Sequence, residues 1–290
     1  MKLTNSDLRQ LADLAVSAAR EAGQMIARSR PQDMQYKTDA GSPASQVVTE
    51  TDQRSERLIL AALRPTLIPF ELGMLTEEQV DDGSRLATDY FWSIDPLDGT
   101  LPFIEGVPGY AVSIALVARD GTPWIGVMYD PVEEVLLAAI KGAGVSRDGE
   151  PWPTEPQPAA RVLSVFADRS FLVAQDRDRV LNALESLAQD CGLQGVEVHA
   201  TGGAVMNATR VLLNPPACYF KFPAPSGGGS VWDFAATACI FNEVGAVATD
   251  IYGKPLDLNR LDGTLMNHRG VLFADDEGLA RGIRALYPTS

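Results

Sequence analysis

The sequence contains little cysteine and histidine, and it has no long apolar segment. Its three cysteines (Cys191, Cys218 and Cys239) are widely spaced and include no CxxC pair, so neither a disulfide framework nor a thiolate metal site is indicated. We expect these thiols to be buried. No stretch approaches the roughly 20 apolar residues of a membrane helix, and the N-terminal residues alternate polar and apolar positions, unlike a secretory signal. These features favour a cytoplasmic protein without membrane association.

Positive charge is also scarce. The chain has 24 Lys and Arg residues against 38 Asp and Glu residues, and its formal net charge is -14. Such a chain repels a polyphosphate backbone, so a nucleic-acid polymer is an unfavourable partner. A small anionic ligand is still compatible with this charge if carboxylates hold divalent cations, because bound cations invert the local potential.

The overall composition is that of an ordinary globular protein: 290 residues, 46% hydrophobic and 21% charged. Apolar residues recur at helical spacing over residues 5–28 and 52–63, and strand-like segments joined by turns follow. From residue 162 onward, strands and helices alternate. The Gly- and Pro-containing segment 142–160 between these patterns predicts a domain boundary. We expect an α+β domain with an antiparallel sheet over residues 1–150 and an α/β domain over residues 151–290.

The most informative segment, residues 92–100, has the sequence WSIDPLDGT. A strand delivers Asp95 to its end, the following proline fixes a turn, and the spacing from Asp95 to Asp98 brings both carboxylates to one side of that turn. Gly99 lets the backbone approach closely, and the amides of Gly99 and Thr100 can hold a phosphate group. The alternative is a surface turn in which Asp98 and Gly99 satisfy local hydrogen bonds only.

Other acidic residues lie at the ends of predicted elements. Glu77 and Glu78 follow an apolar pair, where the alternative is a solvated acidic loop, and Asp233 starts a helix, where the alternative is an ordinary cap. Asp95, Asp98, one carboxylate of the glutamate pair and Asp233 give four carboxylates without a histidine or thiol partner. They make an all-oxygen site, which suits Mg²⁺ or Mn²⁺ and disfavours zinc. Two such ions roughly 3.5–4 Å apart can activate water and neutralise a leaving alkoxide. The set therefore favours phosphoryl transfer to water.

Residues 92–100 resemble the signature W-x-I-D-P-[LI]-D-G-T of the inositol monophosphatase superfamily. Four other segments are similar to family motifs in the same order: residues 48–52 (V-T-x-x-D), 75–78 (an acidic pair), 232–236 (W-D-x-A-A) and 253–257 (G-x-P-L). The resemblance implies a layered αβαβα sandwich, part α+β and part α/β. It also implies a metal-dependent phosphomonoesterase that acts on a small phosphorylated metabolite such as an inositol phosphate.

The resemblance further implies a set of metal ligands. Glu77, Asp95 and the Leu97 carbonyl would bind a first Mg²⁺ ion. Asp95, Asp98 and Asp233 would bind a second. Two or three ions are expected in total, with Mn²⁺ as a substitute.

Catalytic and phosphate-binding roles follow from the same resemblance. Thr100, paired with Asp52, would position and help to deprotonate the attacking water, next to the catalytic Glu77. The amides of Gly99 and Thr100 would hold the phosphate. Homodimers are common among family relatives, so a homodimer is a further expectation.

Substrate choice is expected to depend on three positions. Residues 202–204 (Gly-Gly-Ala), which include Gly203 and Ala204, resemble the family's G-[ST]-A substrate loop without its hydroxyl. Lys221 stands where inositol phosphatases carry a glutamate and where nucleotidase members tend to have a basic residue, and a cation there favours a second anionic group on the substrate. A 3'(2'),5'-bisphosphate nucleotidase or a sugar bisphosphatase is therefore an alternative, and a solvated lysine at a strand end is another interpretation.

Two competing classes have less support. A haloacid-dehalogenase-type phosphatase would carry its second aspartate two positions after the first, where this chain has Leu97. A metal- or phosphate-ligand-binding protein without turnover would be suggested by loss of Thr100, Asp52 or a metal carboxylate, and all of these are present.

Overall fold

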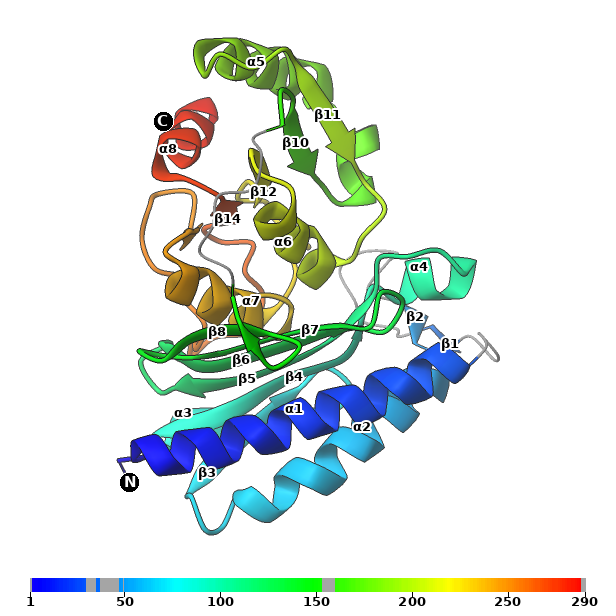
Figure 1. Ribbon diagram of the computed structural model, residues 1–290, viewed down its shortest axis with the longest axis vertical. Coiled ribbons are helices and arrows are strands. Elements are labelled where there is room, and N and C mark those ends of the chain that lie inside the picture. Colours follow the sequence, from blue (N-terminus) through cyan, green and yellow to red (C-terminus); the bar gives the residue numbers. More distant parts are fainter. Residues whose placement is uncertain (1, 30–34, 37–46, 49, 153–159, 288–290) are drawn as a thin grey trace.

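The computed structural model describes residues 2–29, 35–36, 47–48, 50–152 and 160–287, which form five stacked layers (Figure 1). Two helices cover one face of a seven-stranded sheet, two more lie between this sheet and a five-stranded sheet, and another two cover the far face of the smaller sheet. The αβαβα sandwich expected from the sequence is confirmed.

The larger sheet has the order β3-β4-β5-β6-β7-β8-β9, with β3 parallel to β4 and each later pair antiparallel. Its strands are β3 (Leu72–Thr76), β4 (Tyr90–Asp98), β5 (Ala111–Ala118), β6 (Pro123–Asp130), β7 (Val135–Ile140), β8 (Gly144–Arg147) and β9 (Glu150–Pro151). The central strands β4 and β5 are buried along almost their whole length, because helices cover both faces of the sheet.

The outer face of this sheet is covered by α1 (Asn5–Arg28) and α2 (Glu50–Leu63). α1 starts with a reciprocal cap: Thr4 Oγ1 accepts from the Asp7 amide (3.2 Å), and the Asp7 carboxylate accepts from the Thr4 amide (2.8 Å). Its buried stripe is rich in alanine, which lets the helix lie close to the sheet. The remaining short elements of this half are β1 (Gln35–Tyr36), β2 (Val47–Val48), η1 (Arg64–Thr66), α3 (Ser84–Ala87) and α4 (Thr100–Glu105).

The smaller sheet has the order β11-β10-β12-β14-β13, in which β10 is parallel to both β11 and β12, and β14 is antiparallel to both β12 and β13. Its strands are β10 (Leu163–Phe166), β11 (Val196–His199), β12 (Ala217–Lys221), β13 (Val247–Thr249) and β14 (Val271–Ala274). Its far face is covered by α5 (Arg177–Asp190) and α8 (Glu277–Leu286), and η2 (Arg169–Val173) follows β10.

The middle layer consists of α6 (Ala204–Leu213) and α7 (Val231–Val244). α7 packs against the large sheet at unusually short range: a Cβ added at Gly126 of β6 would lie 2.3 Å from the Ala236 carbonyl oxygen. Its first turn is also tied to β5, since Ser113 Oγ donates to the Trp232 carbonyl (3.0 Å). The start of α7 is thereby held beside the centre of the large sheet.

Two details differ from the sequence-based expectations. The strand expected to end at Asp95-Pro96 continues to Asp98, with a shift in its pairing to β5 between Asp95 and Asp98. Proline has no N–H to donate, and such an irregularity is one of the places where a strand tolerates it. Cys218 and Cys239 are buried as expected, but Cys191 is exposed, so the expectation for that thiol is wrong; it follows the last residue of α5.

Some expectations lie outside the described residues. Thr49 of the V-T-x-x-D segment and residues 153–159 of the expected inter-domain segment are among them. The last strand of the large sheet ends at Pro151 and the first strand of the small sheet begins at Leu163, but a boundary between two domains at residue 150 stays a prediction. In the described residues, no helix is long and apolar enough to cross a membrane.

The contact of α7 with β6 predicts the effect of a single methyl group. Gly126→Ala should lower the free energy of unfolding by about 1–3 kcal/mol, because the methyl group meets backbone that cannot rotate away. Gly282→Ala in α8 is the matched control: its methyl group meets only the flexible end of Leu187, and alanine gains up to ~1 kcal/mol of helix propensity. Urea unfolding of both variants checks this, and equal stabilities would contradict the proposed tight contact.

Candidate metal centre

The irregular end of β4 presents two buried carboxylates to the middle layer. Asp95 and Asp98 are 1% and 7% exposed, and the Leu97 amide donates to Asp95 Oδ1 (3.0 Å) across the pairing shift. Gly99 then ends the strand with φ 84°, and a Cβ there would lie 2.6 Å from the Gly109 carbonyl oxygen. Only glycine fits both the left-handed conformation and the close approach, so the backbone turns here with both aspartates on one side.

Asp98 is held by the first turn of α6. The amides of Ala204 and Val205 donate to its two carboxylate oxygens (3.0 and 2.9 Å). A Cβ at Gly203 would lie 2.4 Å from Asp98 Oδ2, so the glycine makes room for the carboxylate. The residues expected to contact substrate, Gly203 and Ala204, therefore also position a candidate metal ligand, which the motif did not indicate; their contact with substrate stays a prediction.

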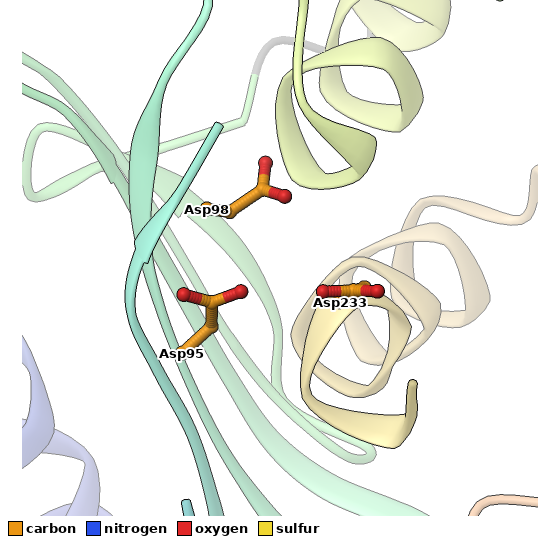
Figure 2. A group of neighbouring side chains, drawn as sticks. All are labelled: Asp95, Asp98 and Asp233. Carbon is orange, nitrogen blue, oxygen red and sulfur yellow. The ribbon is translucent and has the colours of Figure 1, made fainter. Parts of the chain in front are cut away.

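Asp233 completes the group from the first turn of α7. Its Oδ2 accepts from the Ser230 amide (2.7 Å), and a Cβ at Gly229 would lie 2.5 Å from the same oxygen. Asp95, Asp98 and Asp233 each offer a carboxylate oxygen within 4.8 Å of the others. Figure 2 shows the two β4 carboxylates and the α7 carboxylate converging on one space. We call these three residues the aspartate cluster.

The electrostatics of the aspartate cluster favour a bound cation. Burial, followed by the charges of Glu77 and Asp98, raises the pKa of Asp95 well above its ordinary value. Burial and the charge of Asp233 likewise raise the pKa of Asp98, and burial raises that of Asp233. A divalent cation would remove the repulsion that causes these shifts. The donors are all oxygen, without histidine or thiolate, which fits Mg²⁺ or Mn²⁺ better than zinc.

Glu77 lies at the end of β3, beside the aspartate cluster but outside the group of three. Its amide donates to the Ile94 carbonyl (3.1 Å), and its charge raises the pKa of both Asp95 and Asp98. The turn that carries it is held from α2, where Glu56 accepts from Thr76 Oγ1 (2.8 Å). Glu56 was not among the residues expected from the sequence, although it falls one helical turn after Asp52 on the same face.

Asp52 and Thr100 are brought together by the contact between α2 and the end of β4. Thr100 Oγ1 donates to Asp52 Oδ1 (3.1 Å), and both side chains are buried. Ser55, one turn further along α2, donates to the Pro96 carbonyl (2.6 Å) and so fixes the helix against the segment that carries the aspartates. The Leu97 carbonyl oxygen lies 3.4 Å from Thr100 Oγ1, next to this pair.

Lys221 ends β12 and is not a solvated surface residue. Its side chain is 16% exposed, and its Nζ lies 2.6 Å from Asp168 Oδ2 and 5.5 Å from the centre of the Phe234 ring. Burial alone would lower the pKa of Lys221, but the carboxylates of Asp168 and Asp233 outweigh burial and raise it. The interpretation as a solvated strand-end lysine is therefore wrong. Asp168 was missed, although a polar residue just after a buried strand is a recognisable signal.

The sequence model of the Inositol monophosphatase family matches residues 7–285. The chain belongs to this family. The resemblance inferred from the motifs is thus confirmed. Inositol monophosphatase 1 of Sus scrofa is 30% identical over 253 residues, covering 85% of this chain and 85% of the relative. Nus factor SuhB of Pseudomonas aeruginosa is 31% identical over 249 residues, covering 85% of this chain and 88% of the relative.

Solved structures agree with this family membership at the level of the fold. An inositol monophosphatase from Anabaena has a TM-score of 0.70 with this chain at 24% identity, and the match covers 97% of this chain and 98% of the other. An inositol monophosphatase from Thermotoga maritima has a TM-score of 0.69 at 21% identity, over 94% of this chain and 96% of the other. The layered sandwich is therefore the fold of the family.

The raised carboxyl pKa values predict a pH-dependent affinity for Mg²⁺. Binding requires ionised carboxylates, so it displaces protons from Asp95 and Asp98, and the affinity should rise with pH between the ordinary carboxyl pKa and the raised values. The rise should reach up to about tenfold per pH unit for each displaced proton. Calorimetric titration in buffers of different ionisation enthalpy measures both the affinity for Mg²⁺ and the number of protons displaced. If a positively charged side chain already neutralised the cluster, the affinity for Mg²⁺ would instead stay constant between about pH 5 and 8.

The same repulsion predicts that Asp95→Asn stabilises the metal-free protein. Because the raised pKa makes the folded state bind more protons than the unfolded chain, the free energy of unfolding falls as pH rises through that window. An asparagine keeps the acceptor for the Leu97 amide without the charge. We expect the Tm in EDTA to rise by roughly 2–4 °C and the stabilisation by added Mg²⁺ to disappear. Asp120→Asn, on an exposed turn, is the control; a lower Tm for Asp95→Asn in EDTA would count against the repulsion.

Proposed function

We propose that the protein is a Mg²⁺-dependent phosphomonoesterase that hydrolyses a small phosphorylated metabolite, such as an inositol phosphate. The observation that carries the proposal is the aspartate cluster: three carboxylates within 4.8 Å, each accepting a hydrogen bond from a backbone amide. Membership of the inositol monophosphatase family supports the same class of reaction.

The candidate ligands suit magnesium. In the proposal, Asp95, Asp98 and Asp233 hold two or three Mg²⁺ ions together with Glu77 and the Leu97 carbonyl, and Mn²⁺ can take their place. Mg²⁺ bound there lowers the pKa of water and offsets negative charge on the phosphate and on the leaving alkoxide. A phosphate dianion would otherwise meet only repulsion from these carboxylates.

The side chains next to the cluster would orient the reacting groups. Because the Thr100 hydroxyl donates a hydrogen bond to Asp52 Oδ1 (3.1 Å), the lone pairs of Thr100 Oγ1 can accept a hydrogen bond from the attacking water. Glu77 would help to place that water, and the Thr100–Asp52 pair would take up the water proton as the new O–P bond forms and the ester P–O bond breaks. The amides of Gly99 and Thr100 would donate to phosphate oxygens. No phosphoenzyme is required.

Three alternatives define what the experiments must separate. A 3'(2'),5'-bisphosphate nucleotidase or a sugar bisphosphatase would use the same cluster on a substrate with a second phosphate. A metal- or phosphate-binding protein without turnover would keep the cluster but not the reaction. Relatives named Nus factor SuhB carry no phosphatase name, which makes a direct assay of hydrolysis necessary.

The proposal also covers the partner, the location and the oligomeric state of the protein. The net charge of -14 supports a small metabolite and not a nucleic-acid polymer as the partner. A cytoplasmic location without membrane association and a homodimeric state complete it.

Phosphate release is the decisive assay. The wild type should release phosphate from at least one of myo-inositol 1-phosphate, 3'-phosphoadenosine 5'-phosphate, fructose 1,6-bisphosphate and histidinol phosphate, with Mg²⁺ and not with EDTA. Asp98→Asn should lower kcat/KM by on the order of 10²–10³-fold with the fold intact, because it weakens the charge stabilisation of the transition state. Asp120→Asn is the control. Full activity of Asp98→Asn at saturating Mg²⁺ would refute the assignment.

A further inference from the structure

Two neighbouring parallel strands of the small sheet end beside the aspartate cluster with opposite charges. β10 and β12 pair in parallel, with Phe166 opposite Tyr219. Asp168 comes two residues after the end of β10, and Lys221 is the last residue of β12. Because parallel strands end at the same edge of a sheet, these side chains meet there.

Asp168 is held in place by three partners. Its Oδ2 lies 2.6 Å from Lys221 Nζ, and its Oδ1 accepts from the Tyr219 hydroxyl (2.9 Å) and the Asn207 side-chain amide (3.4 Å). Tyr219 and Asn207 come from β12 and α6, so the carboxylate is oriented from two elements. Lys221 also lies over the Phe234 ring, the residue after Asp233. The position of the ammonium is thus set by its surroundings and not by its own flexible stem.

The pair lies near the aspartate cluster, because Lys221 is over the ring of Phe234, the residue that follows Asp233. The charges of both Asp233 and Asp98 act on the Lys221 ammonium, as they do on the Tyr219 hydroxyl. A lysine ammonium has three N–H donors, and the single Asp168 oxygen cannot use them all. At least one N–H donor of Lys221 is therefore not used by Asp168.

The net charge of the pair decides what it can attract. Lys221 and Asp168 together carry no net charge, so a second phosphate that approached the ammonium would also approach the Asp168 carboxylate. Much of the attraction would be cancelled. A hydroxyl group carries no net charge and can still accept a hydrogen bond from the ammonium, so the cancellation costs it little.

We propose that Asp168 is a positioning residue that sets substrate selectivity: by neutralising and orienting Lys221, it makes this side of the site favour hydroxyl groups of the leaving alcohol over a second phosphate. This inference rests on the proposed phosphomonoesterase function. It also reverses the expectation that Lys221 by itself favours a bisphosphate, because that expectation did not include the carboxylate beside it.

The test compares kcat/KM for myo-inositol 1-phosphate and fructose 1,6-bisphosphate in four proteins. The wild type should prefer the monophosphate. Asp168→Asn, which keeps an acceptor for the Tyr219 hydroxyl, should shift the ratio toward the bisphosphate by at least ~10-fold, since it leaves the ammonium unneutralised. Lys221→Met should shift the ratio the other way, because it leaves an unpaired carboxylate. The double variant Asp168→Asn/Lys221→Met should lose the shift toward the bisphosphate that Asp168→Asn alone produces. If Asp168 had only a structural role, this shift would not depend on Lys221.

The matched control is a second ion pair on the same turn, between Arg169 and Glu105 of α4. Glu105→Gln removes a carboxylate there and should leave the ratio unchanged. An unchanged ratio in Asp168→Asn, with wild-type turnover intact, would overturn the inference and leave the proposed function standing. If the wild type releases phosphate from none of the four compounds of the phosphate-release assay, the proposed function fails. The ratio of the affinities for the monophosphate and the bisphosphate in Mg²⁺, measured by calorimetry in the same four proteins, then judges the inference separately.

Discussion

Repulsion among three buried carboxylates is the constraint that shapes the centre of this molecule. Asp95, Asp98 and Asp233 lie within 4.8 Å of one another, and each has a raised pKa. Bringing such groups together costs free energy that the rest of the fold must offset. Backbone amides donate to all three carboxylates, and the charge of Lys221, which is itself paired with Asp168, also lowers the pKa of Asp233. The cluster therefore keeps a negative charge that a divalent cation can satisfy.

The use of backbone amides as donors explains where the two helices of the middle layer begin. Backbone amides with no partner inside their own helix are found in the first turn of a helix. α6 and α7 both begin at the aspartate cluster, and each places a glycine where a side chain would collide with a carboxylate: Gly203 with Asp98 and Gly229 with Asp233. The requirement that backbone amides approach a carboxylate closely thus matches where the two helices start.

Local features of the sequence predicted the fold class and the two β4 aspartates of the candidate site. Helical spacing predicted α1 almost to the residue, and the WSIDPLDGT segment identified Asp95 and Asp98, because a motif of nine residues keeps its ligands together whatever the rest of the chain does. The pairing shift in β4 was less accessible. A proline after an apolar run usually ends a strand, and only the neighbouring strand decides whether pairing resumes.

Contacts between distant segments were expected only where the family resemblance covered them, as for Thr100 with Asp52 and for Asp233 with the β4 aspartates. A backbone amide has no side-chain signature, so nothing in the letters of residues 203–205 indicates that they hold Asp98. The interpretation of Lys221 as a solvated lysine was wrong for a related reason: its partner Asp168 follows another strand, and an unpaired lysine at a strand end is ordinarily solvated. The resemblance did single out the aspartate cluster and Lys221, but not Asp168. It could not predict which of those charges the fold cancels.

That distinction assigns the two ends of a substrate. The aspartate cluster needs added cations and then attracts an anion, whereas the Asp168–Lys221 pair is already neutral and offers directed hydrogen bonds. In the proposed function, a phosphate ester would therefore have one orientation in which both sides are satisfied, with phosphate at the cluster and alcohol at the pair. Reversing it would place a dianion beside a carboxylate and leave the cations facing an uncharged alcohol. Orientation thus follows from the difference in net charge between two neighbouring parts of one site.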